Sequence, residues 1–402
     1  MQINKKVSPF LLTPGPLTTS LATKKAMLND VGSWDNDFKL ITKEIREKLI
    51  QILLETSTQN PSLTSDPYIA VPMQGSGTFS VEAMLGCFVP KNGKALVLSN
   101  GAYGMRCFES LKYFNRSAEI LNFGDFLPPD PTVLQEKLKQ DLFITHVIVI
   151  HCETSSGILN PLADLAKVVE KENRSLLIDS MSAFGAIPID AGRIKFDALV
   201  SSANKCIEGV PGFGFVLAKK SVLVKSKNQS HSLSLDLYNQ WVYMEKTGQW
   251  RFTPPTHTVL AFLEALVQHR TEGGVQGRLS RYSKNKLTLI RGMKKLGFET
   301  LLSERWLSPI IVSFLFPDDP KFEFAKFYNL MKDQGFIIYP GKLTIADTFR
   351  IGCIGQVNEQ IMKKVVLAVE NSLKKMKVQS AKPADDFLKE KEKLEKYELI
   401  NE

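Results

Sequence analysis

Lys205 stands out among the residues that could carry chemistry. It lies in SSANKCIEGVPGFGF (residues 201–215), after an apolar and hydroxyl-bearing run and before a glycine-rich apolar stretch. Most lysines lie on solvated surfaces and extend the amine into water, because burying an ammonium ion is expensive. A lysine in a partly desolvated site has a lowered pKa and can form a Schiff base with a carbonyl carbon. The segment alone leaves both interpretations open.

The segments around Lys205 alternate between strands and helices. Apolar, strand-like runs lie at 68–73, 94–100, 143–153, 175–185, 197–205 and 212–220, and predicted helices lie at 37–55, 78–89, 103–114 and 162–173. Nearly continuous apolar strands that alternate with helices indicate an α/β domain whose mainly parallel sheet is covered on both faces. Ligands of such sheets bind beyond the carboxyl ends of the strands. Residues that follow the strands are therefore the first candidates for a site.

A small-residue turn, QGSGTFS, follows the strand at 68–73 and leads straight into a helix. Its Ser76, Gly77 and Thr78 offer hydroxyl groups and backbone N–H groups, which suit a phosphate. A tight glycine turn with a helix cap gives the same pattern. The turn is neither a Walker A sequence nor a GxGxxG fingerprint, and this argues against ATP and dinucleotides.

Three more strand ends carry candidate side chains. Tyr103 follows the strand at 94–100, where its ring either stacks on a planar ligand or is simply buried while its hydroxyl reaches water. Thr154 lies among polar residues after the strand at 143–153. Asp179 ends the buried run Leu-Leu-Ile, so its carboxyl group needs a partner such as a protonated ring nitrogen, unless it caps a turn.

Together these positions offer the groups that pyridoxal phosphate requires. Lys205 supplies an amine for the aldehyde, Asp179 an acid for the pyridine nitrogen, and Tyr103 a stacking ring, while Thr154 and the turn at 76–78 supply hydroxyl and phosphate-binding groups. Once a substrate amine displaces it, Lys205 is free to move a proton as general base and acid. The combination favours this cofactor more strongly than any member does alone.

Composition and charge limit other function classes. The 402-residue chain has a net charge of +9, but its basic residues are spread along the sequence, so a nucleic-acid surface is not indicated. Its five cysteines form no C-x-x-C pair, which argues against a zinc site and a disulfide framework, and we expect no metal. No signal peptide or membrane-length apolar run is evident. We therefore predict a cytoplasmic protein without a nucleic-acid or membrane partner.

The pattern changes near residue 271. A long polar helix, the three segments PIIVSFLF, FIIYPG and TFRIGCIG and two further helices predict a smaller α+β domain at 271–375. We divide the rest of the chain into an N-terminal arm at 1–19 that packs with this small domain, a large cofactor-binding domain at 20–270 and a charged tail at 376–402.

The ordered motifs GSGT, NGAYG, ETSSG, DSMSAFG and SSANK resemble those of the class V, fold type I pyridoxal-phosphate aminotransferases. More closely, LLTPGPLTTS, GSWD, HCETSSGILNP and FTPPTH are similar to the 2-aminoethylphosphonate:pyruvate aminotransferase family, over roughly residues 10 to 370. The resemblance implies a large domain with a mainly parallel seven-stranded sheet covered by helices and a smaller C-terminal α+β domain. It also implies a homodimer with active sites at the interface.

The resemblance assigns roles by position. Lys205 matches the Schiff-base lysine, and the implied cofactor-binding residues are Ser76, Gly77, Thr78, Tyr103, Thr154, Asp179, Lys205 and Thr253. Thr253, in RFTPPTH, matches a residue that reaches the phosphate of the neighbouring subunit. Arg350, in TFRIGCIG, matches the arginine that binds the acidic group of the substrate. Ser33, in the GSWD loop that borders the substrate in this family, is a second candidate substrate-binding residue.

The implied reaction moves the amino group of 2-aminoethylphosphonate to pyruvate and gives phosphonoacetaldehyde and L-alanine, as part of phosphonate degradation. Another class V transaminase, such as an alanine–glyoxylate or serine–pyruvate enzyme, would share the cofactor residues. A cysteine desulfurase fits less well because Cys353 is not in an evident catalytic loop. A non-catalytic pyridoxal-phosphate-binding regulator would keep the pocket without turnover.

Overall fold

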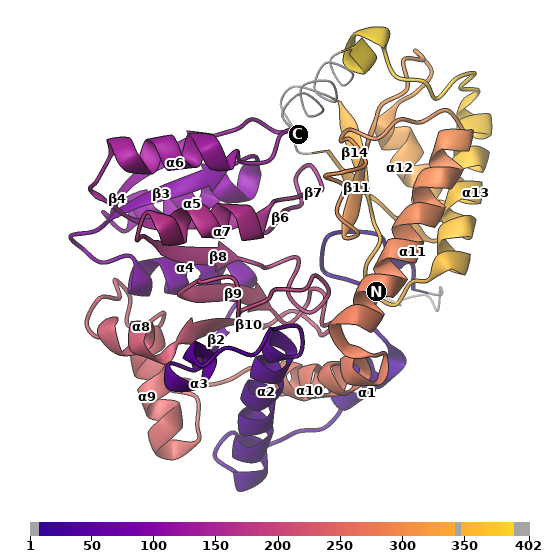
Figure 1. Cartoon of the computed structure of the whole chain (residues 1–402). Helices are drawn as coiled ribbons and strands as arrows, with labels where there is room; N and C mark the ends of the chain where they lie inside the picture. Colours follow the sequence, from indigo (N-terminus) through magenta and orange to yellow (C-terminus); the bar gives the residue numbers. More distant parts are fainter. Residues whose placement is uncertain (1–7, 342–346, 390–402) are drawn as a thin grey trace. The chain divides into compact units, whose positions relative to one another are not determined.

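The computed structural model describes residues 8–341 and 347–389 (Figure 1). It divides into two compact units. The larger unit consists of Thr19–Glu153 and Leu159–Leu279, and the smaller one of the described residues of Met1–Thr18, Thr154–Ile158 and Ser280–Glu402.

A seven-stranded sheet forms the centre of the larger unit. Its order is β2 (Tyr68–Gln74), β10 (Phe213–Lys219), β9 (Ala198–Ser202), β8 (Ser175–Asp179), β5 (Ile144–Ile150), β3 (Lys94–Ser99) and β4 (Ser117–Asn122). Only β10 runs antiparallel to its neighbours; the pairs from β9 through β8, β5 and β3 to β4 are parallel. The mainly parallel seven-stranded α/β sheet predicted from the sequence is therefore confirmed.

Helices cover both faces of this sheet (Figure 1). They are α1 (Leu21–Ala26), α2 (Asn36–Leu54), α3 (Ser62–Ser65), α4 (Gly77–Phe88), α5 (Ala102–Tyr113), α6 (Pro131–Gln140), α7 (Leu162–Lys171), α8 (Lys220–Lys225), α9 (Leu237–Thr247) and α10 (Thr256–Thr271). Alternate residues of β5 enter two separate apolar cores: Val147 and Val149 pack with α2, α6, α7 and α10, and Ile148 and Ile150 pack with α4 and α5. Burial on both faces explains the continuous apolar strands.

The strand boundaries differ from the prediction in three places. The runs at 143–153 and 175–185 end as strands at Ile150 and Asp179, and a short two-stranded sheet of β6 (Cys152–Glu153) and β7 (Ile158–Leu159) follows β5. The run at 197–205 ends at Ser202, so Lys205 lies in a turn three residues later. The sequence analysis did not predict β4, because this edge strand is only partly buried and has polar ends.

The smaller unit contains a three-stranded antiparallel sheet with the order β11 (Ile311–Leu315), β14 (Thr348–Gly352) and β13 (Tyr339–Pro340). Near the N-terminus, β1 (Phe10–Leu11) pairs in parallel with β12 (Phe336–Ile337). The helices α12 (Phe324–Asp333) and α13 (Glu359–Met376) belong to this unit, and α11 (Gly274–Lys295) contains the boundary between the units.

Phe349 lies at the centre of an aromatic cluster in the smaller unit. Its ring centroid lies 5.2–6.4 Å from those of six other phenylalanines, namely Phe298, Phe314, Phe316, Phe322, Phe324 and Phe327. Neighbouring residues of a strand point to opposite faces, so burying Phe349 also directs Arg350, the next residue of β14. The cluster thus helps to orient a candidate substrate-binding side chain.

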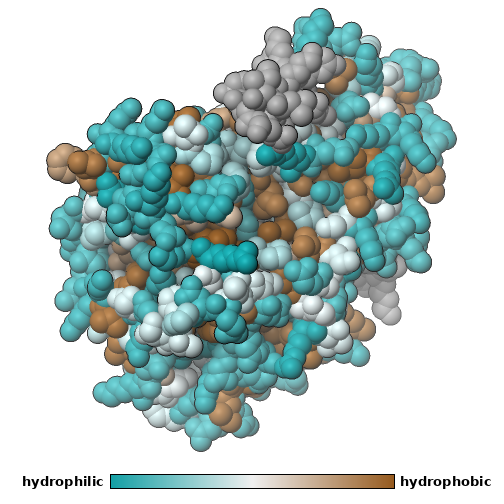
Figure 2. All heavy atoms as spheres, viewed as in Figure 1, coloured by the Kyte–Doolittle hydropathy of each residue, from teal (hydrophilic) through white to brown (hydrophobic). Residues whose placement is uncertain are grey.

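Exposed apolar residues occur singly or in small groups on the face shown in Figure 2, which is otherwise mostly hydrophilic. Among the described residues, no helix combines the length and the apolar character needed to cross a membrane.

We predict that Phe349→Ala lowers the free energy of unfolding by about 3–5 kcal/mol, because it removes a buried ring and leaves a cavity. Urea unfolding followed by circular dichroism measures this change. Phe143→Ala is the control, since Phe143 is 83% exposed and its loss should change stability by less than about 0.5 kcal/mol. Equal, small effects of the two substitutions would show that the cluster does not hold β14.

Candidate active site

The carboxyl ends of the parallel strands bring most of the predicted site residues to one edge of the sheet. Asp179 pairs in register with Ile150 of β5 and Val200 of β9, so these three strands end together. The turn at 76–78 follows β2, Tyr103 follows β3, and Lys205 follows β9. These positions all belong to the larger unit.

Lys205 lies in a tight, hydrogen-bonded turn. The N–H of Glu208 donates to the carbonyl oxygen of Lys205 at 2.8 Å, and the N–H of Gly209 donates to that of Ala203 at 2.9 Å. The side chain of Lys205 is half-buried. Burial lowers the pKa of its amine to about 8, although the nearby Cys206 and Asp179 oppose this shift. A substantial fraction of the amine is therefore neutral, and nucleophilic, near pH 8.

Asp179 is 5% exposed and accepts a hydrogen bond from the N–H of Met181 at 2.9 Å. Burial raises the pKa of its carboxyl group to about 6, and the negative charge of Glu153 acts in the same direction. The Met181 hydrogen bond and the cations Arg106 and Lys205 partly offset these effects. A buried carboxylate of this kind gains stability from a cationic ligand group beside it.

The turn after β2 has the properties of an anion site. Ser76 occupies the N-cap position of α4 but makes no capping hydrogen bond with its side chain, so the cap itself does not satisfy the N–H groups of the first turn. Gly77 packs so closely against the turn after β8 and the last residue of β9 that an added Cβ would lie 2.5 Å from the Met181 sulfur and 3.4 Å from the Ser202 Cβ. The turn thus lies beside the residues that follow Asp179 and precede Lys205.

Tyr103 is fixed at the first turn of α5, where its N–H donates to the buried carboxylate of Glu153 at 2.9 Å. Arg106, one helical turn later, stacks its guanidinium carbon 4.9 Å from the centre of the Tyr103 ring. The Arg106 Nη1 atom also lies 3.5 Å from the Thr78 hydroxyl. Sequence reasoning missed Arg106; its spacing of three residues from Tyr103 on a predicted helix was the available signal.

Thr253 and Ser33 come from other parts of the larger unit. Thr253 is exposed in the loop before α10, which is linked to the end of β2 because the Gln74 amide donates to the Phe252 carbonyl oxygen at 2.8 Å. Ser33 is half-buried in the turn before α2. The strand ends therefore do not account for the placement of either residue.

Thr154 and Arg350 belong to the smaller unit and contact each other. The Arg350 side chain is 1% exposed, and its Nη1 donates to the Thr154 carbonyl oxygen at 2.6 Å. Its Nε and Nη2 donate to the Pro340 carbonyl oxygen at 3.0 and 2.9 Å. Each of the three guanidinium nitrogens thus donates to a backbone carbonyl oxygen, and these hydrogen bonds fix the plane of this buried cation.

The larger unit thus combines an amine of lowered pKa, a buried acid, an aromatic ring and a helix N-terminus. This set suits a phosphorylated aldehyde with a basic ring nitrogen. No group of three or more histidine, cysteine or acidic side chains within residues 8–341 and 347–389 is arranged to hold a metal ion.

Comparison with known proteins identifies the family of the chain. The family model described as Aminotransferase class-V matches residues 111–338. The chain belongs to the class V aminotransferase family. A 2-aminoethylphosphonate–pyruvate transaminase of Rhizobium meliloti is 58% identical to this chain. The alignment covers 96% of this chain and 99% of the relative. A 2-aminoethylphosphonate–pyruvate transaminase of Paraburkholderia xenovorans is 55% identical, over 97% of this chain and 98% of the relative.

Solved structures of aminotransferases have the same fold. The pyridoxamine–pyruvate aminotransferase of Mesorhizobium loti matches with a TM-score of 0.83 and 20% identity, over 95% of this chain and 96% of the other. The alanine–glyoxylate aminotransferase of a Nostoc species matches with a TM-score of 0.83 and 20% identity, over 93% and 97%. This class V chain therefore has the fold type I architecture predicted from its motifs.

The raised pKa of Asp179 predicts a pH-dependent loss of stability in cofactor-free protein. Between pH 3.8 and about 6 the folded protein holds a proton that the unfolded chain releases, so stability falls as the pH rises and the loss is complete above about 6. Asp179→Asn removes this ionisation and should raise the free energy of unfolding at pH 7.5 by about 1–3 kcal/mol.

Urea titrations of both cofactor-free proteins at pH 7.5 and pH 4 measure the effect. The gain should shrink toward zero at the lower pH, where wild-type Asp179 is largely protonated in the folded state. A gain of the same size at both values would contradict the assignment to ionisation.

Proposed function

We propose that the chain binds pyridoxal phosphate and transfers the amino group of 2-aminoethylphosphonate to pyruvate, which gives phosphonoacetaldehyde and L-alanine in phosphonate degradation. The observation that carries the proposal is the placement of Lys205 and Asp179, with oppositely shifted pKa values, at one edge of the sheet. Relatives that are 55–58% identical over nearly their full length are named for this reaction.

The residues of the larger unit fit the cofactor. The N-terminus of α4, with Ser76, Gly77 and Thr78, would hold its phosphate. Tyr103 would stack on its ring, and Asp179 would accept a hydrogen bond from the protonated ring nitrogen. When bound, pyridoxal phosphate supplies an aldehyde carbon that amines attack and a ring that takes up the electrons of a breaking C–H bond.

Lys205 has two functions in this proposal. Its amine, with a pKa of about 8, would hold the aldehyde carbon of the bound cofactor and would give it up to the amine of a substrate. The released amine then removes a proton from the carbon next to the substrate nitrogen and later returns one as an acid. The buried Asp179 carboxylate would stabilise a proton on the ring nitrogen of the bound cofactor.

Arg350 would bind the acidic group of either substrate. A phosphonate and a carboxylate both offer two oxygens to the forked donors of a guanidinium, so one arginine suits 2-aminoethylphosphonate as well as pyruvate. Thr154 and Pro340 hold this side chain through their carbonyl oxygens and thereby limit its rotation. We retain Ser33 as a second substrate contact and Thr253 as a phosphate contact to the neighbouring subunit.

Two other reactions compete with this proposal. An alanine–glyoxylate or serine–pyruvate transaminase would use the same cofactor residues, but the alanine–glyoxylate aminotransferase of Nostoc shares only 20% identity with this chain. A cysteine desulfurase needs a reactive thiol. All five cysteines are buried and form no disulfide bond, and burial raises the pKa of the Cys353 thiol to about 12, so it stays protonated.

We also propose a homodimer and a cytoplasmic location. The large apolar side chains Leu28, Trp34 and Phe79 are exposed in the larger unit and offer surface for a second copy of the chain. Five cysteines that form no disulfide bond in the described residues are compatible with a reducing compartment. Analytical ultracentrifugation of the purified protein tests the dimer.

Purified protein incubated with pyridoxal phosphate, 2-aminoethylphosphonate and pyruvate is expected to form L-alanine and phosphonoacetaldehyde in equal amounts. Initial rates should show the parallel lines of ping-pong kinetics, because the amino group is held between the two half-reactions. Serine with pyruvate, and alanine with glyoxylate, serve as competing pairs. Faster turnover of either pair would favour the alternative transaminase, and no turnover by cofactor-loaded protein would favour the regulator.

We predict that Lys205→Ala lowers the turnover number by about 10²–10⁴-fold or more, since it removes the proton-transferring amine. Alanine formation measures the loss, and circular dichroism checks that the fold is retained. Lys219→Ala is the control, because Lys219 ends β10, whose antiparallel direction places it at the opposite edge of the sheet. Substantial multiple turnover by Lys205→Ala would rule out the role assigned to this lysine.

A further inference from the structure

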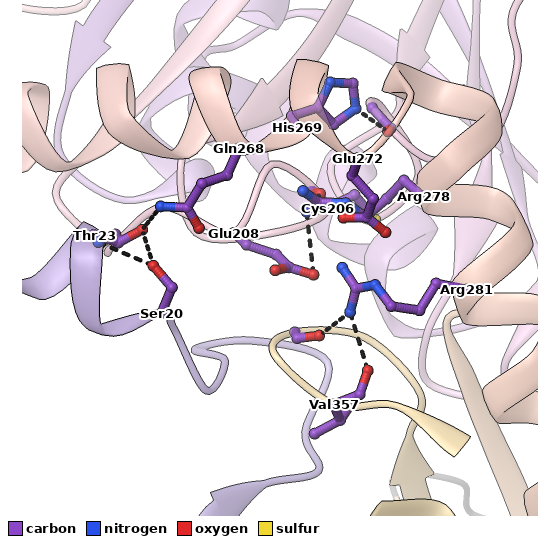
Figure 3. Close-up of polar contacts among 12 residues, drawn as sticks. Ser20, Thr23, Cys206, Glu208, Gln268, His269, Glu272, Arg278, Arg281 and Val357 are labelled. Atoms are coloured by element: carbon purple, nitrogen blue, oxygen red, sulfur yellow. Dashed lines mark hydrogen bonds and ion pairs between the residues drawn. The ribbon is translucent and has the colours of Figure 1, made fainter. Parts of the chain in front are cut away.

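A buried ion-pair cluster contacts Cys206 and Glu208, which belong to the turn that begins at Lys205 (Figure 3). Arg278, on α11, is 1% exposed, and Glu208, the last residue of the turn, is 3% exposed. Glu272, which follows α10, completes the cluster and is about one-quarter exposed. All these residues belong to the larger unit, and the steps proposed above use none of them.

Arg278 binds the Lys205 turn through one nitrogen. Its Nη1 donates to the carbonyl oxygen of Cys206, the residue after Lys205, at 2.7 Å. The same Nη1 lies 3.1 Å from the carboxylate of Glu208. Its Nε lies 2.9 Å from the Glu272 carboxylate, so a different atom makes that ion pair. The guanidinium therefore contacts both the backbone and a side chain of the turn.

The backbone of Glu208 indicates that this contact constrains the turn. Glu208 has a φ angle of +65°, in the left-handed region that residues with side chains rarely adopt. Its N–H nevertheless donates to the Lys205 carbonyl oxygen at 2.8 Å, which closes the turn. Glycine would adopt this conformation more easily. A buried carboxylate at such a position points to a requirement for the charge.

Stability alone explains the cluster poorly. Removing two or three charges from water costs about as much free energy as their attraction returns, and apolar residues of similar size often serve equally well. Planar donors in a fixed arrangement, in contrast, define the position of the carbonyl group and the carboxylate that they bind. The geometry of the Arg278 contacts therefore fits a positioning function.

We propose that Arg278 and Glu208 are positioning residues that fix the Lys205 turn, and so hold the Lys205 amine in line with the carbon it binds. This inference rests on the proposed function of Lys205. Misplacing a reacting group by about 1 Å can reduce a rate by about 10²-fold, and this sets the scale of the expected effect.

The first experiment measures the turn without the cofactor. Hydrogen–deuterium exchange of the amides at 206–209 is compared among wild type, Arg278→Met, Glu208→Gln and the control Glu272→Gln. We expect at least about tenfold faster exchange in the first two variants and wild-type exchange in the control, because Glu272 pairs with Nε, whereas Nη1 contacts the turn. Wild-type exchange in both test variants would overturn the proposal, whichever reaction the protein catalyses.

The second experiment uses the cofactor-loaded protein. The absorbance band of bound pyridoxal phosphate is titrated with pH, and its midpoint should shift in Arg278→Met and Glu208→Gln but not in Glu272→Gln. The turnover number should fall about 10²-fold in Arg278→Met while the KM for 2-aminoethylphosphonate changes by less than about threefold. Equal effects of all three substitutions would indicate general packing and contradict the positioning role.

Two further variants distinguish the effect of the side-chain charges from the effect of the left-handed backbone at Glu208. Arg278→Lys keeps the charge but lacks the planar fork, so it should restore only part of the turnover. Glu208→Gly relieves the left-handed backbone but removes the carboxylate, and we expect it to behave like Glu208→Gln. Full activity of Glu208→Gly would show that the carboxylate is unnecessary. If Arg278→Met does not fold, the Glu208 variants still decide the question.

Discussion

The shared direction of five strands is the constraint on which the candidate site depends. β2, β3, β5, β8 and β9 all run the same way, and only β10 is reversed among the seven strands of the sheet. Segments from four parts of the sequence, which contain Ser76, Tyr103, Asp179 and Lys205, therefore reach one edge. Reversing any of these strands would move its terminal side chain to the opposite edge, where it could not join the others.

Desolvation then gives the gathered groups their chemistry. The same burial favours the neutral form of both groups, so it lowers the pKa of the Lys205 amine and raises that of the Asp179 carboxyl group. Arg106 adds a positive charge near both, and Glu153 adds a negative charge near Asp179. A cofactor with an anionic phosphate and a basic nitrogen would complement this distribution. Binding of such a cofactor would therefore offset part of the free-energy cost of burying Lys205 and Asp179.

Much of this arrangement could be predicted from the sequence, because buried parallel strands are continuous apolar runs and the residues after them are easily found. The edge strand β4 was missed since its residues are half-exposed and lack that pattern. Lys205 was expected at the end of a strand, but β9 stops at Ser202 and a turn follows. The pairing of Arg278 with Glu208 joins residues 70 positions apart, and no local period or motif encodes such a contact. The roles of all the predicted site residues, from Lys205 and Asp179 to Thr253 and Arg350, remain predictions.

Because every cysteine is buried, the rate at which each thiol reacts with a reagent reports on local opening of the structure around it. A thiol must reach solvent and lose its proton before an alkylating reagent can attack it, so the labelling rate of a buried cysteine reports how often its surroundings open. Cys206 directly follows Lys205, whereas Cys353 follows β14 in the smaller unit. Mass spectrometry of partially labelled wild-type protein would therefore measure separately how fast the Lys205 turn opens and how fast the end of β14, which carries Arg350, opens.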